Sequence, residues 1–323
     1  MAYSEEVIRR AQARLAQEKA DCESESNARI ETIYRQYPRL REIDRAMRHS
    51  VAKAVSAAFR KGIDTTAAIQ TIKEENLALQ REREWILEAN DLDESLLEPT
   101  VICSKCGGSG YHGAIMCECL QELCRQEQKK ELSSLLGGKE TFESFRLDYY
   151  STEPDPNFGV SPRQLMQLTF QHCRRYARDF SRKSPSLLFT GGPGLGKTFL
   201  STCIARTVAD SGFSVVYDTA GKLFSDFEAA KFGGRSEDLT IKYLACDLLI
   251  IDDLGTEMTT QFTQSVLYQV INTRLMEEKP VIISTNLTDE ALRQRYSAPI
   301  VSRLLGVYQT CQFLGHDIRQ LRR

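Results

Sequence analysis

The chain has 323 residues, of which 41% are hydrophobic and 27% charged, and its formal net charge is −2. These values are typical of a globular chain with two or three compact units, and they exclude a protein whose overall charge attracts nucleic acids or membranes. No apolar run approaches the roughly 18 residues of a membrane-spanning helix, and the charged start lacks the apolar segment of a signal peptide. We therefore expect a cytoplasmic protein.

Residues 1–98 are expected to form an all-α domain. Apolar residues recur at the spacing of one helical face, at Val51, Ala54, Val55, Ala58 and Phe59. Pro38 divides the earlier helical stretch, and Asp64-Thr65 predicts the N-cap of a helix that runs to about Ala89. Because no catalytic group stands out, this domain is either a surface for protein contacts or a structural bundle.

A cysteine-dense segment, residues 99–125, follows. Five of the ten cysteines lie between Cys103 and Cys124, and in a reducing compartment such crowding favours a metal site over disulfides. The four thiols of Cys103, Cys106, Cys117 and Cys119 suit tetrahedral zinc, with glycines between them that allow a tight knuckle. His112 or Cys124 could replace one thiol, and reduced cysteines in a loop or a redox pair are the alternatives.

The other five cysteines are scattered, and we interpret them as small buried or neutral residues: Cys22, Cys173, Cys203, Cys246 and Cys311.

Residues 126–183 are expected to link the cysteine segment to the next domain. KKELSSLLGG predicts a short helix ending at Gly137-Gly138, and PRQLMQLTFQHCRRYARDF predicts an amphipathic helix after a proline-rich loop. In residues 184–323, four short apolar runs alternate with helical segments: SLLFTG, SVVYD, DLLIIDD and PVIISTN. That alternation indicates a parallel sheet with crossover helices.

The stretch GGPGLGKTFL, residues 191–200, fits the pattern G-x-x-x-x-G-K-[ST] between a predicted strand and a predicted helix. Glycines let backbone N–H groups surround phosphate, and the helix N-terminus adds partial positive charge. Lys197 is expected to reach the β- and γ-phosphates and Thr198 to bind Mg²⁺. A plain glycine turn is the alternative. The residues expected to bind the nucleotide are Gly191, Gly192, Pro193, Gly194, Leu195, Gly196, Lys197, Thr198 and Phe199.

Polar side chains follow two further predicted strands. Asp252 and Asp253 end one strand, and Asn286 ends another. Ligands sit at the carboxyl edge of a parallel sheet, so Asp252 suits a Mg²⁺-associated acid and Asp253 a residue that orients the attacking water. Asn286 could contact the γ-phosphate or the water, or it could simply cap the next helix.

These motifs, together with SRLLG and the terminal GHDIR, resemble the AAA+ ATPases of the DnaC/DnaI helicase-loader and IstB transposition-helper group from about Thr141 onward. The resemblance implies an AAA+ core with a five-stranded parallel sheet and a minimal lid. It also implies that Arg303 projects into the ATP site of a neighbouring subunit and that Arg319 senses the γ-phosphate. The expected catalytic residues are Lys197, Asp252, Asp253, Asn286, Arg303 and Arg319. Asp253 departs from the Glu found in many AAA+ ATPases, which predicts slow turnover.

The resemblance further implies ATP-dependent loading of the replicative DNA helicase onto single-stranded DNA. The motifs predict ATP, Mg²⁺ and Zn²⁺ as cofactors, and the resemblance implies self-association through the ATP site. The alternatives are a transposition helper and an adaptor that binds nucleotide without hydrolysing it. Candidate DNA contacts combine basic and aromatic residues, although the same segment also fits an amphipathic helix. They are Lys222, Lys231, Phe232, Arg235 and Lys242.

Overall fold

The computed structural model describes residues 3–58, 65–135, 140–232 and 238–321, and it describes side chains over the slightly shorter ranges 3–50, 70–132, 140–231 and 240–320. The chain divides into two compact units, residues 13–119 and residues 1–12 with 120–323. Residues 99–119 of the cysteine-dense segment share a unit with the N-terminal helices, and residues 126–183 share one with the sheet. The boundaries predicted after residues 98, 125 and 183 stay predictions.

Three helices build the unit of residues 13–119: α1 (Glu5–Gln36), whose first turns belong to the other unit, α2 (Pro38–Ala58) and α3 (Thr65–Ala89). Pro38 is the first residue of α2, as predicted, because a proline is tolerated where the helix needs no backbone donor. Tyr34, Leu40, Ile43, Ile86, Leu87 and Leu97 form the buried core. The stripe from Val51 to Phe59 and the predicted cap at Asp64 lie outside the described side chains.

A short 3-10 helix η1 (Glu94–Leu97) and a two-stranded antiparallel hairpin, β1 (Tyr111–His112) and β2 (Ile115–Met116), complete this unit. The helix that follows, α4 (Glu118–Leu135), begins at the second cysteine pair. The helix predicted over residues 129–138 is therefore only the C-terminal part of a longer one, which periodicity missed because of the flanking cysteines. Gly137-Gly138 lies outside the described residues.

The second unit contains a five-stranded parallel sheet in the order β4-β5-β6-β3-β7, which confirms the predicted core. Its strands are β3 (Leu187–Thr190), β4 (Val215–Thr219), β5 (Leu248–Leu254), β6 (Val281–Thr285) and β7 (Gln309–Gln312). The four apolar runs became the first four of these strands. β7 is short and mostly polar, with only Cys311 buried, so no apolar pattern marks it.

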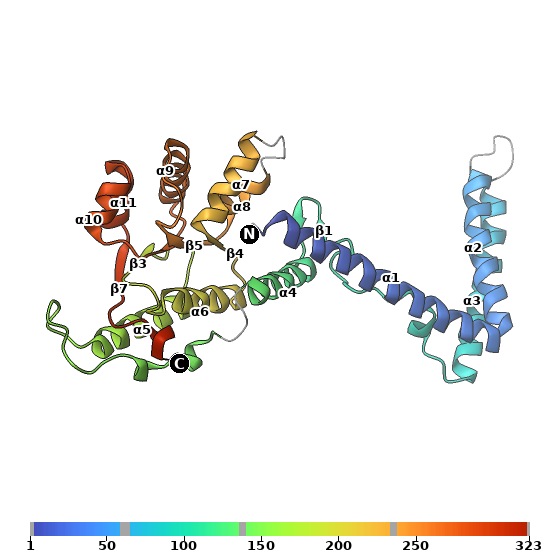
Figure 1. The fold of residues 1–323 in the computed structure, drawn as a ribbon. Coiled ribbons are helices and arrows are strands. Elements are labelled where there is room, and N and C mark those ends of the chain that lie inside the picture. The colour runs from blue at the N-terminus through green and yellow to red at the C-terminus, as the bar shows by residue number, and fades with distance from the viewer. Residues whose placement is uncertain (1–2, 59–64, 136–139, 233–237, 322–323) are drawn as a thin grey trace. The chain divides into compact units, whose positions relative to one another are not determined.

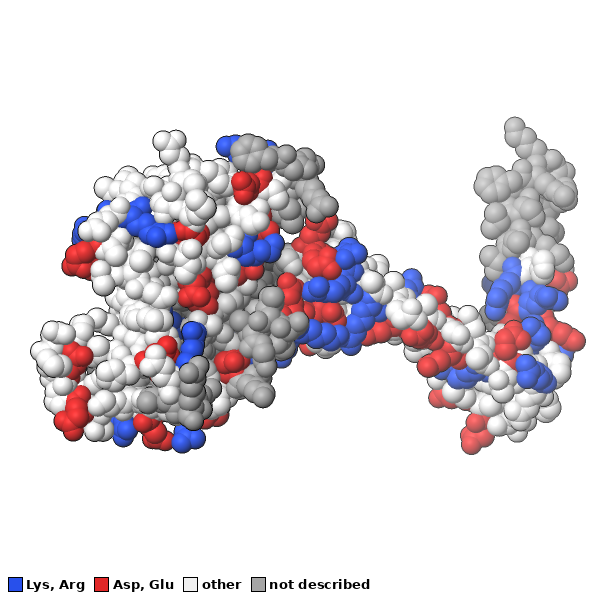
Figure 2. All heavy atoms as spheres, in the orientation of Figure 1, with Lys and Arg blue, Asp and Glu red and all other residues white. Residues whose placement is uncertain are grey.

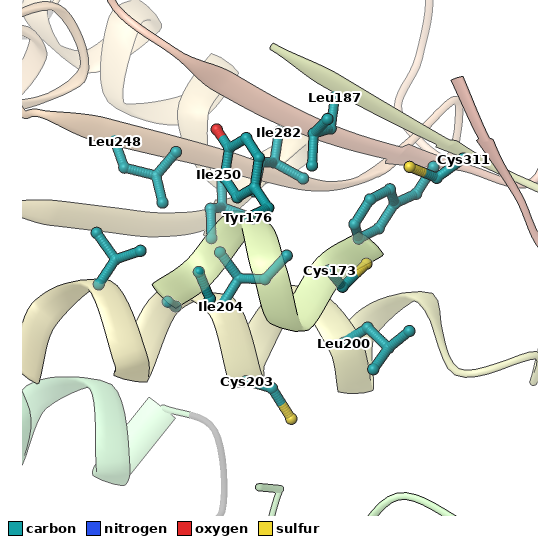
Figure 3. Packing of buried hydrophobic residues seen from close by; sticks show 14 of the residues in the cluster. Cys173, Tyr176, Leu187, Leu200, Cys203, Ile204, Leu248, Ile250, Ile282 and Cys311 are labelled. Atoms are coloured by element: carbon teal, nitrogen blue, oxygen red, sulfur yellow. The ribbon is translucent and has the colours of Figure 1, made fainter. Parts of the chain in front are cut away.

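Alternate strand residues face opposite sides of the sheet. Leu187, Leu248, Ile250 and Ile282 pack against α5 (Pro162–Arg178) and α6 (Lys197–Asp210), as Figure 3 shows. Phe189 belongs to the same cluster. The other face packs against α7 (Ala220–Phe232), α8 (Asp238–Ala245), α9 (Gln261–Met276), α10 (Asp289–Arg295) and α11 (Ala298–Gly306) (Figure 1). Each fully buried Leu or Ile contributes about 1.5–3 kcal/mol, so both layers hold the sheet firmly.

Of the five scattered cysteines, Cys173, Cys203, Cys246 and Cys311 are buried and Cys22 is partly exposed. Short 3-10 helices η2 (Phe142–Ser144) and η3 (Leu147–Tyr149) precede α5, and α12 (Ile318–Leu321) follows β7. Within the described ranges, no helix combines the length and the apolar character needed to cross a membrane.

Candidate nucleotide-binding site

The glycine-rich loop connects β3 to the first residue of α6, Lys197. Gly194 and Gly196 have φ angles of +70° and +92°, which side-chain-bearing residues rarely adopt. A Cβ on Gly194 would also lie 1.8 Å from Oδ1 of Asp317. The loop can therefore adopt this conformation only with glycine at Gly194, and it leaves the N-terminus of α6 facing the cavity.

Lys197 is held by three neutral acceptors. Its Nζ donates to the carbonyls of Gly191 (2.7 Å) and Gly192 (2.6 Å) and to Oδ1 of Asn286 (2.7 Å). Burial lowers the pKa of the ammonium to about 8, and Asp253 and Asp252 only partly offset this. Asn286 thus lies beside the lysine at the edge of the sheet, where the sequence predicted both.

Asp252 lies behind Thr198 and is 4% exposed. Its Oδ2 accepts from Thr198 Oγ1 (3.0 Å) and Tyr217 OH (2.9 Å), and its Oδ1 accepts from Ser284 Oγ. A hydroxyl next to a fixed carboxylate is suitable for Mg²⁺ carried by a nucleotide. Tyr217 and Ser284 were not predicted, since nothing in a strand pattern reveals which hydroxyl will face an acid on the neighbouring strand.

Asp253 lines the same cavity as Asn286 and Arg319. Its φ angle is +56°, uncommon for a non-glycine residue, and its backbone N–H donates to Ser284 Oγ (2.9 Å). Burial, followed by the neighbouring charge of Asp252, raises the pKa of its carboxyl group. The backbone therefore turns here so that two consecutive acids reach different places, one behind Thr198 and one in the cavity.

The segment GHDIR docks on the glycine-rich loop. The N–H of Ile318 donates to the carbonyl of Gly194 (3.1 Å), and Asp317 Oδ1 accepts from the N–H of Arg319 (2.9 Å). Arg319 also lines the cavity. Asp317, which the sequence interpretation passed over, fixes the start of α12 and fills the space that Gly194 leaves.

The cavity of about 480 Å³ extends from the glycine-rich loop to an aromatic end. Phe145, Tyr149, Tyr150 and Phe199 line that end, and Tyr150 OH donates to the carbonyl of Leu195 (2.8 Å). A phosphate cradle beside flat apolar rings suits a nucleotide with its base on the rings. Only Phe199 was predicted here; the aromatic run TFESFRLDYY upstream was the available signal for the rest.

Comparison with known proteins also indicates a nucleotide-binding domain. The family model of the IstB-like ATP-binding proteins matches residues 125–305, more than half of the chain. The chain belongs to this family. The resemblance to the helicase-loader and transposition-helper group is thereby confirmed, and the IstB-like match includes Arg303 but ends before Arg319.

Two relatives are named replicative helicase loaders. The DnaC of Buchnera aphidicola subsp. Acyrthosiphon pisum is 22% identical over 57% of this chain and 74% of its own length, and that of Escherichia coli K12 is 26% identical over 41% and 55%. A crystal structure of the DnaC helicase loader, 18% identical, superposes over 54% of this chain and 97% of its own with a TM-score of 0.46.

Within the IstB-like region, Arg303 lies away from the cavity lining just described. It projects from α11 toward α9, where its guanidinium contacts Tyr268 and Asn272. The expected role of Arg303 requires a neighbouring subunit, and the structure contains one chain. This role therefore stays a prediction.

Three of the five candidate DNA contacts, Lys222, Lys231 and Lys242, have partners within the chain. Lys222 pairs with Asp226, and Lys242 Nζ lies 2.9 Å from Asp218 and 3.2 Å from Asp226. Lys231 Nζ lies 5.3 Å from the ring centroid of Phe262. The side chain of Phe232 and all of Arg235 lie outside the described residues. On the face drawn in Figure 2, basic and acidic atoms are interspersed.

The four cysteines of the predicted knuckle come together. Their sulfur atoms all lie within 4.8 Å of one another, with Cys103 and Cys117 at 3.9 Å and Cys106 and Cys119 at 3.5 Å. Tetrahedral zinc with Zn–S bonds of about 2.3 Å separates sulfurs by about 3.8 Å, so these thiols fit the ion. Neither His112, which is exposed, nor Cys124, which is buried in α4, belongs to this group.

Proposed function

We propose that this protein is an ATP-dependent loader of the replicative DNA helicase onto single-stranded DNA. The observation that carries the proposal is a phosphate cradle in which the loop carbonyls and Asn286 hold Lys197 and Thr198 contacts Asp252, inside an IstB-like domain related to named helicase loaders. Those relatives share only part of their length with this chain. The partner and the substrate are therefore inferred from the geometry of the site together with the similarity to helicase loaders.

The ATP site has a role for each predicted residue. Lys197 and the loop N–H groups bind the β- and γ-phosphates, and Thr198 with Asp252 holds Mg²⁺, which supplies charge neutralisation at the phosphates. Asp253, Asn286 and Arg319 line the same cavity. In this proposal Asp253 and Asn286 act on the attacking water and Arg319 on the γ-phosphate. Arg303 of a neighbouring copy completes the site, so the protein self-associates through ATP.

ATP acts chiefly as an assembly and release switch. Asp253 is one methylene shorter than the Glu found in many AAA+ ATPases, so its carboxylate reaches the water poorly and turnover is slow. An ATPase assay with and without single-stranded DNA, with Lys197→Ala as the control, tests this role. If no Lys197-dependent turnover appears under either condition, the protein is a non-hydrolysing adaptor instead.

The N-terminal helices of residues 1–98 and the knuckle of residues 99–125 form the helicase-binding region. Trp85, 68% exposed on α3, and Ile115, 73% exposed on the hairpin, support this assignment, because exposed apolar and aromatic side chains commonly anchor protein interfaces. The core domain then contacts DNA.

Zinc holds the knuckle together. Metal analysis of the purified full chain is expected to find about one zinc per molecule, and Cys106→Ser is expected to lose it because three thiolates and one hydroxyl bind the ion poorly. The matched control Cys22→Ser should retain the metal, since Cys22 lies outside the cluster. Equal zinc in wild type and Cys106→Ser would contradict the assignment.

Affinity capture of the full chain with ATP, followed by mass spectrometry, tests the proposed partner. Recovery of the replicative helicase, reduced by Trp85→Ala but not by an exposed-residue control such as Met276→Ala, is the expected result. Recovery of a transposase instead would favour the alternative function of a transposition helper, which the IstB-like match also suits.

A further inference from the structure

Several contacts hold the guanidinium of Arg303 near the surface of the core domain. Nε and one terminal nitrogen both donate to Oδ1 of Asn272, at 3.2 and 2.7 Å. The same terminal nitrogen donates to Tyr268 OH (3.1 Å), and the other donates to the carbonyl of Pro299 (3.1 Å). Cζ lies 4.7 Å from the centroid of the Tyr268 ring.

The two residues that hold it occupy one face of α9. Tyr268 and Asn272 are four positions apart, so their side chains lie one helical turn from each other. Tyr268 is 36% exposed, and Asn272 and Arg303 are partly buried. The side chain of Arg303 is therefore fixed at the protein surface, and little conformational entropy remains to be lost when it binds a ligand.

All these acceptors are neutral. An amide oxygen, a phenol and a backbone carbonyl orient the guanidinium but leave its positive charge uncompensated. No carboxylate pairs with Arg303 among the side chains that the structure describes. A phosphate group approaching the guanidinium would meet the full charge in a fixed geometry, without first breaking an ion pair.

We propose that Asn272 and Tyr268 are positioning residues for Arg303, which hold its guanidinium oriented and fully charged for the triphosphate bound by a neighbouring copy of this chain. The inference rests on the proposed function, in which Arg303 completes the neighbour's ATP site. It adds that α9 supplies the orientation and that the neutrality of residue 272 is required.

Replacing the neutral amide by a carboxylate separates this role from a purely structural one. Asn272→Asp keeps the size of the side chain and gives Arg303 a stronger partner, so a structural tie between α9 and α11 would be preserved. A positioning role predicts the opposite for catalysis, because the new ion pair neutralises the guanidinium and holds it back. We expect ATP turnover to fall about tenfold or more, a fraction of the effect of losing such an arginine entirely.

The experiment measures ATP turnover, nucleotide affinity and melting temperature of the full-length variants, alone and mixed. Asn272→Asp alone is expected to hydrolyse ATP slowly. Its affinity for ATP should lie within about twofold of wild type and its melting temperature should be no lower, because its own nucleotide pocket is intact. Mixed in equal amounts with Asp253→Asn, whose pocket cannot orient water but whose Arg303 is intact, it should recover about a quarter of the wild-type rate, since a quarter of random head-to-tail contacts join a good pocket to a good arginine.

Further variants make the result specific. Tyr268→Phe keeps the ring and loses one acceptor, so its ATP turnover should fall only slightly. Tyr268→Ala also loses the ring, so its ATP turnover should fall further. Gln269→Asp adds the same charge to an exposed neighbouring position of α9 and should behave as wild type. If Arg303→Ala turns over ATP as fast as wild type, the shared site of the proposed function fails. If Arg303→Ala is slow but Asn272→Asp is fast, or is slow and not rescued by mixing, only the positioning role is overturned.

Discussion

Two sets of basic residues in the core domain differ in what holds them. Lys197 and Arg303 are bound by neutral acceptors: two backbone carbonyls and Asn286 for the lysine, and Asn272, Tyr268 and Pro299 for the arginine. Lys222 and Lys242, on α7 and α8, are bound by the carboxylates of Asp218 and Asp226. The first set keeps its positive charge, and the second set is neutralised.

Among these four cations, the difference separates those proposed to serve a ligand from those that serve the fold. Arg274 is also held by neutral carbonyls but is fully buried, so neutral partners favour ligand binding only where the cation faces a cavity or the surface. An ion-paired lysine offers a phosphate little net attraction, because the neighbouring carboxylate repels the same phosphate. A cation held by carbonyl and amide dipoles is oriented at little cost to its electrostatic attraction. The number of lysines and arginines in a segment is therefore a poor guide to anion binding, because the partners and the exposure of each cation also matter.

The largest effect should follow from removing Lys197. Lys197→Ala is expected to weaken Mg²⁺–ATP binding by about a hundredfold or more, about 2.8 kcal/mol, because the only side-chain cation at the start of α6 is lost. Isothermal titration of ATP into each protein measures the change. Lys222→Ala, which removes an ion-paired lysine, is the matched control and should bind ATP as wild type does; equal weakening by both would erase the distinction.

The neutralised set predicts a stability effect instead. Asp226 is 4% exposed, and it accepts hydrogen bonds from Tyr243 OH (2.7 Å) and from both lysines. Asp226→Asn is expected to lower the free energy of unfolding by about 1–3 kcal/mol at pH 7, measured by urea denaturation. ATP affinity should not change.

The pH dependence of this stability has a definite sign. Burial raises the pKa of Asp226, but hydrogen bonds from Lys222 and Tyr243 outweigh it, so the folded-state pKa lies below the ordinary value. The stabilisation is therefore present above the unfolded pKa of about 4 and is lost as the pH falls through the lower folded pKa. The difference in free energy of unfolding between wild type and Asp226→Asn should shrink as the pH falls. A difference that grows at low pH would be inconsistent with paired charges.

A smaller effect should appear in the protonation of Lys197. Its pKa of about 8 without nucleotide means that the ammonium is largely charged at pH 7 and largely neutral at pH 9. A bound triphosphate favours the charged form and raises this pKa. ATP binding should therefore take up close to one proton per molecule at pH 9 and almost none at pH 7. Calorimetry in two buffers of different ionisation enthalpy measures the uptake. Equal uptake at both pH values would show that the lysine does not titrate in this range.

The smallest effect should be on single-stranded DNA. Lys222→Ala and Lys242→Ala are expected to change the affinity for an oligonucleotide by less than about twofold, because each paired lysine releases few counterions. Fluorescence anisotropy at two salt concentrations tests this. A clear loss of salt dependence in either variant would place these lysines on the DNA after all.

The fold and the phosphate end of the site could be predicted from particular residues. The run from Gly191 to Thr198 has a fixed spacing with one local geometry, and apolar runs such as Leu248–Ile251 are long enough to specify buried strands. β7 could not be found from its own residues, because it is a short edge strand whose residues other than Cys311 face solvent. It was expected only from the resemblance.

The partners of the site residues were less accessible to sequence reasoning. Tyr217 reaches Asp252 from the neighbouring strand, and Asn272 reaches Arg303 from a separate helix. Such pairs depend on strand register and helix packing, which no local pattern encodes. The aromatic end of the cavity was missed for a similar reason, since Phe145 and Tyr150 come from a segment that looked like a linker.

The measurement that tests the account most directly is the transfer of replicative helicase onto closed circular single-stranded DNA, which has no free ends. With ATP and the wild-type chain, DNA-bound helicase isolated by gel filtration should rise well above the amount bound by helicase alone, and with Lys197→Ala it should stay at that background. Equal amounts of bound helicase with wild type, with Lys197→Ala and with no added chain would contradict the proposed function.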